Sequence, residues 1–250
     1  MSYLGRIKGT ANELIDSVLN TLKVSLHDSY GNVIGSNNES LNTMSYFERV
    51  SQGLVAGAKI IQKYGKNPAV GTVGFSTIWN GGGVYTGFPS TAETVTITSS
   101  SVNDTNTAGT GMRSLRMYGL SASGLEQTED ILLNGTTPVT STLSYLRLNK
   151  AKGLTGGTLA HNDGNITIRQ SVTTANIFAV MPATYNSTMI AAYTIPADKN
   201  GYLLSQRSAI ANKTSAAVDI RIKVRQPGNL FTVNGEAALN SQGSGFINID

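Results

Sequence analysis

The chain has 250 residues, of which 40% are apolar and 14% charged, and it carries a formal net charge of +4 and no cysteine. This length and apolar content suit one large all-β domain or a smaller domain with an N-terminal appendage, and they exclude a disordered chain. The basic residues are scattered, which argues against a nucleic-acid partner, and the lack of cysteine excludes disulfides and thiolate metal sites.

The start of the chain is polar, without the 7–15-residue apolar centre of a secretory signal. We therefore expect assembly in the cytoplasm. The longest apolar runs, such as Met189–Tyr193, are far shorter than the roughly 20 residues that span a bilayer. No membrane partner is expected.

The first predicted element is a helix that begins at Thr10, where Thr10 and Glu13 form a capping-box pattern. Apolar residues follow at helical spacing, and their shared face has to be buried. These residues are Ala11, Leu14, Ile15, Val18, Leu19 and Leu22. The helix either packs on its own domain or docks on a neighbouring subunit, so Leu14, Ile15, Val18, Leu19 and Leu22 are candidate assembly contacts.

A β-hairpin is predicted next, because apolar residues alternate from Leu22 to Leu26, turn residues occupy 28–32, and Val33–Ile34 follow. The polar stretch 35–45 is typical of a linker. We therefore predict an N-terminal arm over residues 1–45 and a main domain over residues 46–250. Residues 46–65 contain three glycines, which favour loop or strand at least as much as helix.

Trp79, the single tryptophan, lies in the segment IWNGGGVYTGFP. Three successive glycines after a tryptophan indicate a turn whose backbone passes close to the ring. Trp79 with Tyr85 could form a carbohydrate-stacking surface, but packing in a core or an interface is the commoner fate of such rings.

Short alternating runs separated by Gly, Asn, Asp and Ser clusters predict antiparallel strands at 93–99, 112–120, 125–134 and 139–149. Turns are expected at Ala122–Gly124 and Asn134–Gly135. Further strand-like runs are Ile166–Ile168, Ile177–Val180, Ile190–Ile195, Tyr202–Ser205, Val218–Val224 and Phe231–Val233. About ten short strands predict a mainly β fold, an antiparallel sandwich or jelly-roll-like domain.

A search for chemistry finds no catalytic, cofactor or metal constellation. His27 and His161 have no ligand partner at metal spacing. Glu126 and Asp130 share a strand face, as a glycosidase pair could, but such carboxylates are more often the polar side of an exposed strand. Alternation over 219–225 places Arg221, Lys223 and Arg225 in a basic stripe, which suits an interface rim better than nucleic acid.

Four runs together resemble a family of structural proteins of tailed bacteriophages that is frequent in phages of aquatic bacteria. They are GTGMRSLRMYGLSASGLEQTEDILLNGTTPVTSTLSYLRLNKAKGL, GNITI, MIAAYTIPADKNGYLL and DIRIKVRQPGNLFTV. The resemblance covers roughly residues 46–233.

The resemblance implies a non-enzymatic virion protein that packs against capsid, neck or tail proteins, as a head-decoration, head-fibre or tail-associated component. A homo-oligomer is expected, with a trimer as one arrangement, and the resemblance implies assembly in the host cytoplasm and residence in the virion. The alternative is a receptor- or carbohydrate-binding module of a phage fibre or spike, with Trp79 and Tyr85 as its surface residues.

Overall fold

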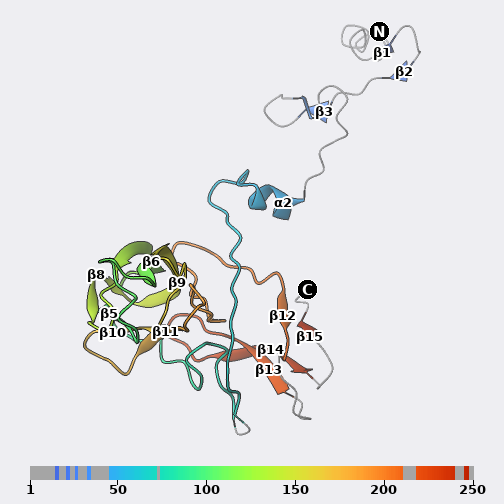
Figure 1. Cartoon of the computed structure of the whole chain (residues 1–250). Helices are drawn as coiled ribbons and strands as arrows, with labels where there is room; N and C mark the ends of the chain where they lie inside the picture. Colours follow the sequence, from blue (N-terminus) through green and yellow to red (C-terminus); the bar gives the residue numbers. More distant parts are fainter. Residues whose placement is uncertain are drawn as a thin grey trace, which may run out of the picture. The chain divides into compact units, whose positions relative to one another are not determined.

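The computed structural model describes residues 45–71, 74–210 and 218–239, together with the backbone of the short strands at 15–16, 21–22, 26–27, 33–34 and 245–247. The chain divides into two units, residues 1–62 and residues 63–250 (Figure 1). The first unit thus extends beyond the arm predicted for residues 1–45.

In the residues of the first unit that the structure describes, there are two short strand pairs and one short helix. Strand β1 (Ile15–Asp16) pairs with β2 (Thr21–Leu22), and β3 (Leu26–His27) pairs with β4 (Val33–Ile34), both antiparallel. The β3–β4 pair confirms the predicted hairpin. Helix α2 (Tyr46–Ser51) follows, and Ser45 and Glu48 cap it reciprocally.

The helix predicted from Thr10 to Leu22 is wrong at the four residues of this stretch that the structure describes, because these pair as strands. Ile15 lies opposite Leu22, whereas a helix would place them two turns apart on one face. A helix of about three turns is marginal by itself, and β-branched Ile15 and Thr21 lower its propensity further. Leu14, Val18 and Leu19 lie outside the described residues.

The second unit is built on two antiparallel sheets, and the strands predicted at 93–99, 112–120 and 125–134 are confirmed within two residues. The single strand predicted at 139–149 is wrong, because the chain leaves one sheet at Tyr145 and enters the other at Arg147. The four-stranded sheet has the order β11-β10-β5-β8, and the three-stranded sheet has the order β7-β6-β9. The strands are β5 (Glu93–Ser99), β6 (Met112–Leu120), β7 (Glu126–Leu132), β8 (Val139–Tyr145), β9 (Arg147–Gly156), β10 (Ile166–Gln170) and β11 (Ile177–Met181). The turns at Gly124 and Gly135 have positive φ, as their turn sequences predict.

One hydrophobic core contains buried side chains from both sheets. Alternate residues of β5 (Val95, Ile97) and of β10 (Ile166, Ile168) are buried, and Leu115 and Met117 of β6 join them. A single residue, Leu146, separates β8 from β9, so the chain passes from one sheet directly into the other. The mainly β, antiparallel prediction is confirmed, and the sandwich or jelly-roll arrangement stays a prediction.

The described residues of the second unit also form two two-stranded sheets. Strand β12 (Gln206–Ser208) pairs with β15 (Gly245–Ile247), and β13 (Val218–Val224) pairs with β14 (Thr232–Leu239).

Two predicted strands in the second unit are wrong. Tyr202–Ser205 precedes β12 and is not in a strand, and of Ile190–Ile195 only Ile190 bridges to another segment, at Trp79. The backbone there bonds elsewhere: the Ala191 amide donates to the Ile78 carbonyl, and the Thr194 amide donates to the Asn149 side chain. Within the described residues, no helix is long and apolar enough to cross a bilayer.

Candidate assembly surfaces

Trp79 and Tyr85 belong to the core, which corrects their prediction as surface-binding residues. Their exposed fractions are 3% and 7%, and their rings meet edge to face with centroids 5.1 Å apart. The Tyr85 hydroxyl donates to the Phe178 carbonyl of β11 at 2.9 Å, and burial raises the pKa of Tyr85. A stacking platform needs an exposed ring face, and neither residue offers one.

The glycines after Trp79 have the role that the sequence predicted. A Cβ atom at Gly81 would lie 2.2 Å from the Trp79 ring, and Gly82 and Gly83 have positive φ. Only a residue without a side chain fits so close to the indole. The glycine turn therefore packs against the Trp79 ring and does not expose this ring on the surface for a ligand.

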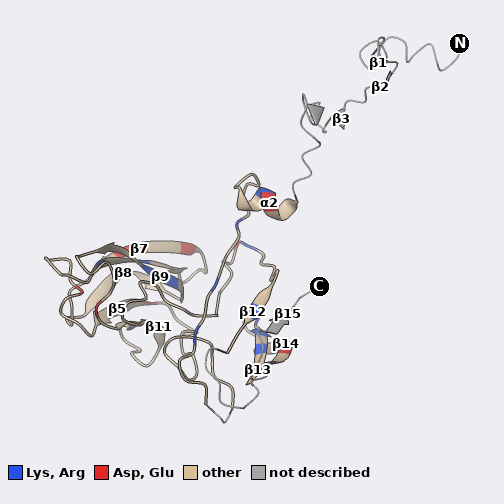
Figure 2. Cartoon of the chain, turned by 45° about the vertical axis from the view of Figure 1, so that its right-hand side comes forward, with Lys and Arg blue, Asp and Glu red and all other residues tan. Residues whose placement is uncertain are grey.

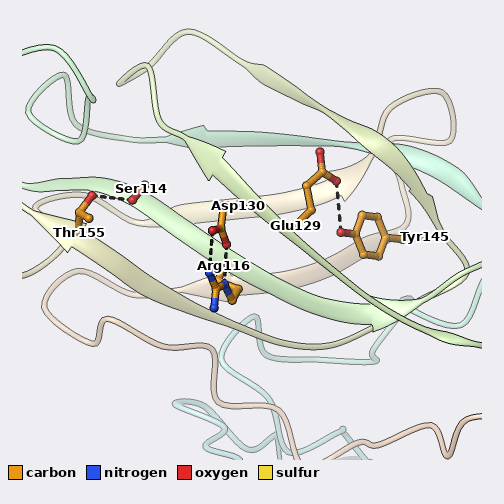
Figure 3. A network of polar contacts seen from close by, with 6 residues as sticks. All are labelled: Ser114, Arg116, Glu129, Asp130, Tyr145 and Thr155. Carbon is orange, nitrogen blue, oxygen red and sulfur yellow. Dashed lines mark hydrogen bonds and ion pairs between the residues drawn. The ribbon is translucent and has the colours of Figure 1, made fainter.

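Of the predicted carboxylate pair, Asp130 is engaged in an ion pair. Arg116 of the adjacent strand β6 donates to both of its oxygens, at 2.6 and 2.7 Å (Figure 3). This bond lowers the pKa of Asp130, whereas a general acid requires a raised pKa. Asp130 is therefore held as a carboxylate and is unsuited to the role of general acid.

Glu129, which lies between those two carboxylates in sequence, accepts hydrogen bonds from the neighbouring strand β8. Its carboxylate accepts from the Thr142 amide and hydroxyl, both at 2.6 Å, and from the Leu143 amide and Tyr145 hydroxyl, both at 3.2 Å. All four donors belong to β8, in the other sheet (Figure 3). Glu129 therefore joins the edges of the two sheets where no strand ladder does.

Figure 2 shows basic residues in blue on strand β13. Aromatic and acidic side chains contact residues of this basic stripe. The guanidinium of Arg221 lies 3.9 Å from the Phe75 ring centroid and 3.0 Å from a Glu236 oxygen. Arg225 lies over Phe231 at 4.6 Å. These cation–π contacts stabilise the β13–β14 ribbon, so the stripe is not a free row of cations.

Exposed large apolar side chains occur in several parts of the chain, and two segments outside the core sheets carry several of them close together in sequence. The first segment is Gly201–Ser205, where Tyr202 is 84% exposed; the second is the ribbon tip, where Leu230 is 86% exposed. Leu203, Leu204, Val224, Phe231 and Val233 are also exposed. Sequence reasoning missed these residues as a surface. The sequence does contain a signal for them, the uninterrupted apolar run Tyr202-Leu203-Leu204. A half-buried strand would alternate apolar and polar residues instead.

No family model, curated protein or solved structure matches the chain. Among the described residues, no three His, Asp or Glu side chains gather as metal ligands. The exposed apolar residues of Gly201–Ser205 and of the ribbon tip are candidates for a contact surface.

Proposed function

We propose that the chain is a non-enzymatic structural protein of a tailed-bacteriophage virion, an oligomeric head-decoration, head-fibre or neck- or tail-associated component. One observation carries the proposal: most apolar residues of the two core-bearing sheets are buried, while Tyr202 in Gly201–Ser205 and Leu230 at the ribbon tip are 84% and 86% exposed. Exposed apolar residues gathered in this way mark surfaces that another protein covers. The resemblance of residues 46–233 to phage structural proteins is our reason for proposing that this assembly is a phage virion.

The N-terminal arm is proposed as the attachment to neighbouring virion proteins. Its short strand pairs precede residue 45, and the core residues from Trp79 to Ile190 all belong to the second unit. Removing residues 1–40 should therefore leave the core of the second unit intact.

The alternative, a carbohydrate- or receptor-binding module, depended on Trp79 and Tyr85. Both are buried, so no observation now favours it.

Mass spectrometry of purified virions of the phage that encodes the chain tests the proposal. The protein should be present in virions, and a variant lacking residues 1–40 should melt like the full chain but be lost from particles. Absence of the full chain from virions overturns the proposed function. Normal incorporation of the truncated chain overturns only the role of the arm.

A further inference from the structure

Lysines from two distant segments of the sequence meet beside strand β9. Lys150 and Lys152 flank the buried Ala151 on β9, so both lie on the exposed face of the sheet. Lys63 comes 86 residues before Asn149, yet its ammonium group donates to the Asn149 carbonyl of β9. Burial, and then the nearby charge of Lys150, lower the pKa of Lys63. The fold therefore gathers basic residues that are scattered in the sequence.

Lys66 extends this group along β9. Its ammonium group donates to the Tyr185 hydroxyl at 2.6 Å. Tyr185 comes two residues before Ser187, which forms a β-bridge with Lys152. We call Lys63, Lys66, Lys150 and Lys152 the lysine patch.

The lysine patch has no acidic partner in the part of the chain that the structure describes. Its four lysines form no ion pair with a described Asp or Glu side chain. Arg116 lies opposite Lys152 in the strand register, and Arg116 engages both oxygens of Asp130. The carboxylate on this sheet face is therefore already paired. Like charges held close together repel one another, so an anionic partner would relieve the repulsion.

Lysine is the side chain expected for phosphate rather than for protein carboxylates. A carboxylate is matched best by the two parallel hydrogen bonds of arginine. Lysine is depleted at protein–protein interfaces, whereas arginine is enriched there. An ammonium group is a compact point charge with three rotatable donors, which suits the oxygens of a phosphate from many directions. The composition of the lysine patch therefore favours a nucleic-acid backbone over an acidic protein.

An exposed aromatic ring accompanies the lysines. Tyr64 lies between Lys63 and Lys66 in sequence and is 67% exposed. Proteins that bind single strands combine cations, which neutralise the phosphates, with aromatic rings on which the bases stack. The bases of a duplex are stacked inside the helix, so a duplex would use only the lysines. Tyr64 therefore favours a single strand.

We propose that the lysine patch and Tyr64 bind single-stranded nucleic acid without sequence preference. Lys66, Lys150 and Lys152 contact phosphates, Tyr64 stacks on a base, and the half-buried Lys63 adds its charge behind them. This inference does not rest on the proposed function.

Fluorescence anisotropy tests the proposal, with the full chain titrated into a labelled oligothymidylate of about 20 nucleotides, longer than one typical site of roughly 4–16. Between about 50 and 200 mM salt, three phosphate contacts predict a slope of log K against log salt of about −2. Lys150→Gln and Lys152→Gln should each reduce the size of this slope by about 0.7. Tyr64→Ala should weaken binding about 5- to 100-fold and leave the slope unchanged.

Lys199→Gln is the matched control, because it removes the same charge from a lysine that pairs with Asp198 at 2.6 Å. This variant should bind like the wild type, and the melting curve of every variant shows that it is folded.

Three results would overturn the inference. The first is a wild type that does not bind the oligonucleotide at low salt. The second is a set of folded Lys150, Lys152 and Tyr64 variants that bind as the wild type does. The third is a duplex of the same length, or polyglutamate, that binds at least as tightly as the single strand, because the patch would then recognise a duplex or an acidic protein.

Discussion

Removal of the Glu129 carboxylate should destabilise the second unit, because this side chain joins the two sheets. In Glu129→Ala the amides of Thr142 and Leu143 and the hydroxyls of Thr142 and Tyr145 lose their shared acceptor. A hydrogen bond to a charged group contributes about 1.5–3 kcal/mol, and less where water replaces it.

The site is half-exposed, so water can satisfy part of this loss. We expect Glu129→Ala to lower the free energy of unfolding by about 2–3 kcal/mol, about the value of one such bond. Glu129→Gln keeps one acceptor oxygen and should cost about 1 kcal/mol. For a unit of this size, 1 kcal/mol corresponds to roughly 2–4 °C in Tm, so the alanine variant should melt about 4–12 °C lower.

Urea unfolding followed by circular dichroism measures this loss. Glu126→Gln is the control, because Glu126 is on the same strand and is exposed; it should change stability by less than about 0.5 kcal/mol. If Glu129→Gln and Glu126→Gln lose equal stability, or if Glu129→Ala unfolds like the wild type, the idea that Glu129 joins the sheets is wrong.

Three further predictions concern the core, a buried carboxylate and a buried amine. Trp79→Ala should lower unfolding free energy by about 3–5 kcal/mol, and an unchanged melting curve would contradict the core position of its ring. Asp104 is fully buried and accepts from the Ser99 hydroxyl and the amides of Met112, Asp163 and Gly164; Asp104→Asn should cost at least about 2 kcal/mol in urea unfolding, and a loss below 0.5 kcal/mol would refute this role. Burial and the nearby charge of Lys150 lower the pKa of Lys63 to about 8 from 10.5, so the folded state disfavours its charged form. The stability of the wild type relative to Lys63→Met should therefore fall as pH drops from 10.5 to 8 and stay constant below 8, and a pH-independent difference in urea midpoints would exclude the shift.

The glycine turn after Trp79 shows which structural features the local sequence could predict. Three glycines beside a tryptophan indicated a backbone close to the ring, and the 2.2 Å approach at Gly81 confirms it. The same residues could not show whether the ring faces water or the core. That depended on β11, about a hundred residues later, whose carbonyl at Phe178 accepts from Tyr85.

The arm shows the opposite outcome. The spacing from Thr10 to Leu22 satisfied a helical template, yet Ile15 pairs with Leu22 in a strand ladder. A short helix gains too little from its own hydrogen bonds to decide its structure, so contacts beyond the segment decide it.

The sequence by itself determined the mainly β class, the hairpin at 26–34 and the strands from Glu93 to Tyr145, because period-two alternation and turn residues act within a few residues of one another. Only the tertiary structure decided that Trp79 is buried, that Glu129 joins two sheets, and that Tyr202 and Leu230 are exposed. Burial and exposure depend on which distant segments cover a side chain, and the local pattern carries no record of that.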